Sequence, residues 1–176
     1  TANRLRDSGK AQEAEDLLRQ QPASTRIDLT LADWAEQRGD HNTAKAAYST
    51  VLQREPQNED ALLGLTEVYI AQGDKDAARA ELAKLPAAQN GQPPSLNMQR
   101  RIAMAQAGLG DSAAAEQTFS KIIIPQAKSQ PASMDNALVL RDAARFQAQN
   151  GQPQQALETY KDAMVSSGIT STRPAD

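Results

Sequence analysis

At five places along this chain of 176 residues, a glycine expected to end a helix is followed five residues later by an alanine. Successive glycines are separated by 30, 34, 37 and 41 residues. Glycine can take the left-handed conformation that ends a helix, and alanine lets neighbouring helices cross closely. A period near 34 residues therefore predicts stacked helix pairs. The pairs are Gly9 with Ala14, Gly39 with Ala44, Gly73 with Ala78, Gly110 with Ala115, and Gly151 with Ala156.

Three of these glycines are followed by an aspartate that the sequence predicts either to cap the next helix or to add negative charge at its start. The aspartates are Asp40, Asp74 and Asp111. A carboxylate at this position accepts a hydrogen bond from a free backbone N–H and favours the positive end of the helix dipole. We expect each Gly-Asp corner to join the two helices of one pair.

Composition limits the classes of partner. A hydrophobic content of 39% predicts a folded core, and the net charge of −3 with dispersed Lys and Arg disfavours nucleic acid and anionic membranes. The chain has no cysteine, which excludes disulfides and thiolate metal sites. No apolar stretch approaches the about 20 residues that span a bilayer. We expect no cofactor and no membrane-spanning segment.

The pattern predicts the following division of the chain. Two proline-containing stretches, at about 86–95 and 125–133, account for the longer spacings and are expected loops where the stack bends. The expected parts are a half repeat with the second helix only at 1–24, repeats at 25–58, 59–92, 93–129 and 130–170, and a linker towards a C-terminal domain at 171–176.

The second unit resembles the tetratricopeptide repeat. Leu31, Gly39, Ala44, Tyr48 and Pro56 stand where that family places its signature residues. The resemblance implies an all-α solenoid, a right-handed superhelix of antiparallel helix pairs, in which Ala78, Ala115 and Ala156 pack the later repeats as Ala44 packs the second. It also implies that the first helix of each pair lines a concave face.

The whole chain resembles the periplasmic tetratricopeptide region of the enterobacterial outer-membrane cellulose exporters. LQREPQNEDALLGLTEVYIAQGDKDAARAELAKLP and NGQPQQALETYKDAMVSSGITSTRPAD carry this resemblance. It implies a periplasmic scaffold that links an inner-membrane synthase to an outer-membrane β-barrel pore. The implied partners are proteins of the cellulose synthesis and secretion complex, with weak contact to glucan or peptidoglycan. The alternative is a generic adaptor that binds a peptide or protein segment in its groove.

Helical spacing gives the residues expected on the concave face. The early positions are mostly acidic and the later ones mostly basic, which predicts either a groove for a partner of opposite polarity or a solvated helix surface. A clamp for a C-terminal carboxylate is not expected, because matching lysines and asparagines are missing from the neighbouring units. The candidates are Arg26, Asp33, Glu36, Asp60, Glu67, Asn97, Arg100, Met104, Arg141 and Arg145.

Neither sugar stacking nor catalysis is expected. Most aromatic residues have core spacing, which leaves few exposed rings for a sugar face. The single histidine, His41, lies in a predicted surface turn, and Glu13, Glu15 and Asp16 lie on a predicted polar helix face. No pocket is predicted that would separate the pKa values of two carboxyl groups, so we expect no enzyme activity. The aromatic residues concerned are Trp34, Tyr48, Tyr69, Phe119, Phe146 and Tyr160.

Overall fold

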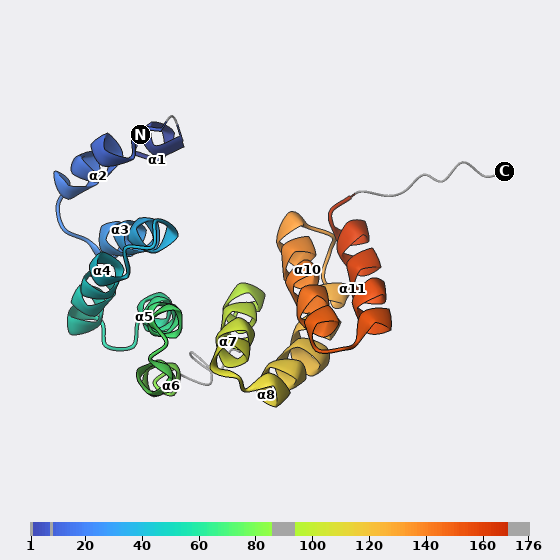
Figure 1. Cartoon of the computed structure of the whole chain (residues 1–176). Helices are drawn as coiled ribbons and strands as arrows, with labels where there is room; N and C mark the ends of the chain where they lie inside the picture. Colours follow the sequence, from blue (N-terminus) through green and yellow to red (C-terminus); the bar gives the residue numbers. More distant parts are fainter. Residues whose placement is uncertain (1, 8, 86–93, 169–176) are drawn as a thin grey trace. The chain divides into compact units, whose positions relative to one another are not determined.

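The computed structural model describes residues 2–7, 9–85 and 94–168 of the chain. Every regular element in these ranges is a helix, and the helices follow one another as side-by-side pairs (Figure 1). The all-α prediction is confirmed. The chain divides into two compact units, unit 1 at Thr1–Pro86 and unit 2 at Ala87–Asp176.

Unit 1 holds three helix pairs. In residues 1–24 the sequence predicts a second helix only, but a short helix that ends at Asp7 precedes it, and the left-handed Gly9 lies between the two. Arg4 and Arg6 lie in the last turn of this short helix, where positive charge is favourable. The helices are α1 (Ala2–Asp7), α2 (Ala11–Arg19), α3 (Thr25–Gln37), α4 (His41–Arg54), α5 (Glu59–Gln72) and α6 (Lys75–Leu82).

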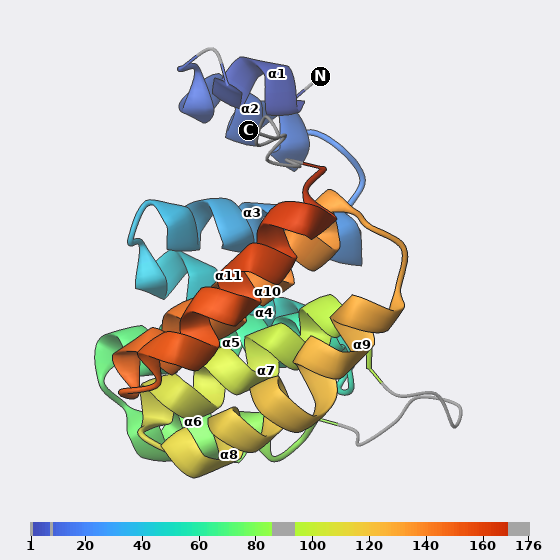
Figure 2. The same ribbon diagram turned by 90° about the vertical axis from the view of Figure 1, so that its right-hand side faces the viewer.

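Unit 2 holds two helix pairs, and the second helix of its first pair is extended. Figure 2 shows this helix continuing through α9, with α10 and α11 side by side as the following pair. The elements are α7 (Leu96–Leu109), α8 (Ser112–Gln117), the π-helical segment η1 (Thr118–Ile123), α9 (Ile124–Ser129), α10 (Met134–Gln149) and α11 (Pro153–Ser166).

The glycine of each repeat forms the turn between the two helices of a pair. All five glycines have positive φ, between 74° and 91°. Asp40 and Asp74 accept the expected capping bonds from Thr43 and Ala77, both at 3.1 Å, whereas Asp111 makes no such side-chain bond. Asp111 stands at the N-cap position of α8 and places a negative charge at the start of that helix without a capping bond.

The alanine of each repeat is buried in the second helix of its pair. Ala44, Ala78 and Ala115 are 0% exposed, on α4, α6 and α8, and Ala156 on α11 is 3% exposed. Ala14 on α2 is also 0% exposed. Ala44 belongs to the core cluster of unit 1, and Ala115 packs with Phe119 in that of unit 2. A methyl side chain at these positions lets the two helices approach closely, as the spacing in the sequence indicates.

The loop predicted at 125–133 is wrong over most of its length. Pro125 lies in α9, and the backbone N–H of Ile124 donates to the carbonyl of Phe119, five residues earlier. Proline has no N–H, and in an α-helix its ring clashes with the carbonyl four residues before it. The wider π turn ahead of Pro125 relieves this clash and lets the helix continue. Only 130–133 is loop, and most of the other predicted loop, 86–93, lies outside the described residues.

The aromatic side chains pack largely as expected. Trp34, Tyr48, Phe119 and Phe146 are at most 4% exposed. In unit 2 the rings of Phe119 and Phe146 lie 5.1 Å apart between η1 and α10. Tyr160 differs, because its side chain on α11 is 37% exposed.

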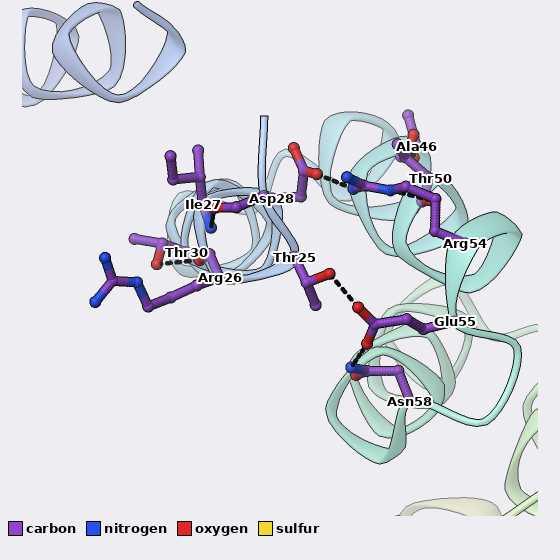
Figure 3. A network of polar contacts seen from close by, with 11 residues as sticks. Thr25, Arg26, Ile27, Asp28, Thr30, Ala46, Thr50, Arg54, Glu55 and Asn58 are labelled. Atoms are coloured by element: carbon purple, nitrogen blue, oxygen red, sulfur yellow. Dashed lines mark hydrogen bonds and ion pairs between the residues drawn. The ribbon is translucent and has the colours of Figure 1, made fainter. Parts of the chain in front are cut away.

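Polar contacts join the start of α3 to the end of α4 (Figure 3). The hydroxyl of Thr25 donates to the carboxylate of Glu55, which also accepts a 2.8 Å bond from Asn58. Beside them, Arg54 pairs with Asp28. These bonds lower the pKa of the Glu55 carboxyl, the Thr25 bond most. The two helices of this pair are thus held together by surface hydrogen bonds as well as by the core.

Candidate functional site

Two of the acidic candidates of unit 1 meet at a buried tyrosine. The hydroxyl of Tyr48 on α4 lies 2.7 Å from Asp33 and 3.0 Å from Glu36, both on α3. A phenol has one proton, so it donates to one carboxylate at a time. Burial, followed by the bond to Asp33, raises the pKa of Tyr48 far above its usual value. Asp33 and Glu36 therefore help to hold α4 against α3.

The ring of Tyr48 lies directly against α5. A Cβ atom built on Gly64 would lie 2.2 Å from the ring carbon that carries the hydroxyl. Real Cβ atoms do not approach other atoms this closely. Any side chain at position 64 would therefore have to displace the Tyr48 ring, whereas the backbone conformation of Gly64 itself does not demand glycine. Helical spacing alone does not reveal this contact.

The other candidates of unit 1 do not gather at one place. Arg26 is exposed on α3, and Figure 3 shows its guanidinium pointing away from the Thr25–Glu55 contact. Asp60 lies in the first turn of α5, and Glu67 is half-buried further along the same helix.

The environment of Glu15 differs from the one predicted. It is expected on a polar helix face, yet it is only 5% exposed. Its carboxylate pairs with Arg19 on its own helix and with Arg38 at the end of α3. The long arginine side chains cover the carboxylate, and a periodic pattern within α2 contains no sign of a partner from another helix.

Three of the five candidates of unit 2 come together around a buried aspartate. Arg100 on α7 lies 2.7 Å from the carboxylate of Asp142 on α10, and Arg141 lies 3.1 Å from its other oxygen. Arg100 also donates to the side-chain oxygen of Asn97 at 2.9 Å. Asp142 is 8% exposed, so a buried carboxylate fixes two guanidinium groups and links the first helices of consecutive pairs.

These residues form one wall of an open pocket of about 710 Å³. Its sides come from α7, α9 and α10 and from the short loop between α9 and α10. The apolar lining is Pro94, Leu96, Leu138 and Val139. The charged lining is Arg100, Asp135, Arg141 and Asp142. The amide and hydroxyl lining is Ser95, Asn97, Gln126, Gln130, Ser133 and Asn136.

Three of the predicted residues line this pocket and two do not. Asn97, Arg100 and Arg141 are in the lining, whereas Met104 and Arg145 are exposed further along the same helices. Asp142 is not among the residues predicted from the sequence, although it follows Leu138 by four residues and so shares its helix face. Asp142 balances the charge of the arginines, and the basic surface expected in the later repeats is partly neutralised.

The described residues contain no group of three or more His, Cys, Asp or Glu side chains that could hold a metal ion. His41, expected in a turn, is the first residue of α4 and is half-buried there. Within the same residues, no helix combines the length and the apolarity needed to cross a membrane.

The comparisons with known proteins agree with this architecture. The tetratricopeptide repeat family model matches residues 35–102. A crystal structure of a tetratricopeptide repeat protein from Parabacteroides merdae is similar at a TM-score of 0.71 and 18% identity, covering 94% of this chain and 62% of that one. At this identity the likeness concerns the fold alone.

Two curated relatives are similar over the entire chain. Cellulose synthase operon protein C of Escherichia coli K12 is 70% identical over 176 residues, and the protein of the same name in Salmonella typhimurium is 66% identical. The chain spans 15% of the length of each relative. The chain therefore has the all-α fold of tetratricopeptide-repeat proteins, and its sequence is similar throughout to a segment of cellulose synthase operon protein C.

Proposed function

We propose that this chain is a periplasmic protein-interaction scaffold in a cellulose export system, part of an outer-membrane protein that connects the inner-membrane synthase to the outer-membrane pore. The observation that carries the proposal is the 70% identity over all 176 residues to cellulose synthase operon protein C. Sequences this similar keep the same core and much of the same surface.

The construction of the repeats suits a scaffold. Each helix pair is fixed by a left-handed glycine and a buried alanine, which leaves the outer helix faces free to vary. The exposed apolar side chains on α11, Leu157, Met164 and Val165, give the last pair a surface for further protein contact. The expected work of such a chain is binding and spacing, without covalent chemistry.

The second candidate is a generic adaptor that binds a peptide or protein segment. The pocket between α7 and α10 favours it, because its walls come from the first helices of two consecutive pairs. The two candidates differ in compartment and in dependence on cellulose production, and both differences are measurable.

Cysteine labelling of the full-length protein tests the compartment. The chain has no cysteine, so Gln53→Cys on the exposed side of α4 introduces a thiol at a known place. We expect a membrane-impermeant maleimide to label it once the outer membrane is permeabilised, with Ala44→Cys, which is 0% exposed in the same helix, as the unlabelled control. Labelling that requires rupture of the inner membrane would contradict a periplasmic location.

Secreted cellulose tests the function itself. Ala44→Trp places a large side chain at a fully buried position, whereas Gln53→Trp places it at an exposed position of the same helix. In the full-length protein we expect Ala44→Trp to reduce secreted cellulose and to abolish cross-linking to the synthase complex, and Gln53→Trp to leave both unchanged. Normal secretion from cells whose repeats are unfolded would refute the scaffold.

A further inference from the structure

Most of the polar side chains that line the unit 2 pocket can both donate and accept a hydrogen bond. Four amide side chains and two hydroxyl side chains line it, and each of these groups can both donate and accept a hydrogen bond. A sugar hydroxyl has the same dual character. The lining therefore matches a ligand that offers many groups able to donate and accept, more closely than one with acceptors or donors alone.

The charges of the lining also favour an uncharged ligand. Arg100 and Arg141 are balanced by Asp135 and Asp142, and Asp142 already accepts from both guanidinium groups. A ligand carboxylate or phosphate would face two aspartates and compete with a bond of 2.7 Å. A cation would meet two arginines. An uncharged ligand avoids both conflicts, and a hydroxyl beside an Arg–Asp pair can accept from one and donate to the other.

We propose that this pocket holds a short segment of uncharged glucan chain. The inference rests on the proposed function, which supplies a neutral glucan as the exported polymer. No aromatic residue is among those that line the pocket, so sugar faces are not stacked on rings. Hydrogen bonds exchanged for those with water give little net affinity, so the contact is weak and lets the polymer move on.

The apolar residues of the pocket set the orientation of the bound glucan segment. Leu96 lies on α7 and Leu138 on α10, two different helices that line the pocket, and the side chain of Leu138 is 40% exposed. They offer narrow contacts to the C–H surface of a sugar ring without the area of an aromatic face. A glucan segment between them would place its ring edges towards the amides and the Arg–Asp pairs.

Titration of the whole 176-residue chain with cellohexaose, followed by amide chemical shifts, tests the proposal. We expect shifts confined to α7, α9 and the first half of α10, saturating only at millimolar concentration. Arg141→Ala should weaken binding by about tenfold, the effect of losing one charge-assisted hydrogen bond. Arg145→Ala is the matched control, because it removes the same side chain from the same helix outside the pocket lining, and binding should not change.

Two peptides separate the alternatives. One is an uncharged peptide with blocked ends, and the other carries a free C-terminal carboxylate. Shifts at the pocket with either peptide but not with cellohexaose would overturn the glucan assignment, as would equal effects of Arg141→Ala and Arg145→Ala. The absence of shifts with cellohexaose at saturating solubility would also overturn it. If cellulose secretion still depends on the repeats in that case, only the pocket assignment fails and the scaffold stands.

Discussion

Consecutive repeats meet in different ways in the two units. In unit 1 the ring of Tyr48 lies against Gly64, so a side chain of α4 fills the space up to the backbone of α5. Tyr48 follows the repeat alanine of its helix by four residues, and in unit 2 the equivalent residue is Phe119. The ring of Phe119 lies against another ring, that of Phe146 on α10. The contact of a ring with a glycine brings α4 and α5 close together, whereas in unit 2 an open pocket lies between the first halves of α7 and α10.

The difference shows what an insertion within a repeat can build. Gly110 and Gly151 are 41 residues apart, seven more than Gly39 and Gly73. The added length extends the second helix through η1 and α9, and α9 and the loop after it supply Gln126 and Gln130 to the pocket. Extra residues that look like a hinge in the sequence form a wall in the structure.

The largest expected effect is at the contact of the ring with the glycine. Gly64→Ala forces the Tyr48 ring away from α5, and we expect it to destabilise unit 1 by about 2 to 3 kcal/mol. In an ordinary helix interior the same change stabilises by about 1 kcal/mol, so the sign is informative. Urea unfolding followed by the fluorescence of Trp34, the single tryptophan and a buried residue of unit 1, measures it.

Tyr48→Leu supplies the control for this substitution. Leucine lacks the outer ring atoms that lie next to Gly64, so in the Tyr48→Leu background the cost of Gly64→Ala should largely disappear. If the destabilisation of the double variant equals the sum of those of Gly64→Ala and Tyr48→Leu, the ring does not press on α5.

A smaller effect is expected at the ion pairs of unit 2. Asp142→Asn leaves the guanidinium of Arg100 without its anion, and we expect it to destabilise the unit by about 1 to 2 kcal/mol. Amide hydrogen exchange in α7 and α10 is the measurement. Asp162→Asn removes an equivalent but more exposed pair with Lys128 and should cost about 0.5 kcal/mol or less. Equal effects of the two variants would show that Asp142 does not link α7 to α10.

The smallest effect is expected at the surface contact between Thr25 and Glu55. Because the folded-state pKa of Glu55 lies below its ordinary value of 4.5, the contact stabilises unit 1 above that pH and is lost as the carboxylate takes up a proton. Wild type should therefore unfold at slightly higher urea than Glu55→Gln at pH 7, and the gap should close as the pH falls below 4.5. A gap that widens in acid would contradict the direction of the shift.

Local patterns predicted the helices well and the contacts between helices poorly. Glycine and alanine at regular positions indicate where each pair turns, and the five repeat glycines all have positive φ between the two helices of a pair. Glu15 and Asp142 each have a second partner outside their own helix, Arg38 and Arg100, and no pattern within one helix identifies it. The loop predicted at Pro125 was wrong because a proline ordinarily breaks an α-helix, whereas here the π turn before it accommodates the ring.

Residue-resolved chemical shifts and hydrogen exchange over 112–129 test most directly whether the added residues build a helix. We predict helical Cα shifts without interruption through Pro125, and protection of the amide of Ile124 by its bond to the carbonyl of Phe119. Random-coil shifts and fast exchange from 125 onward would contradict the account, since the wall of the pocket would then be absent.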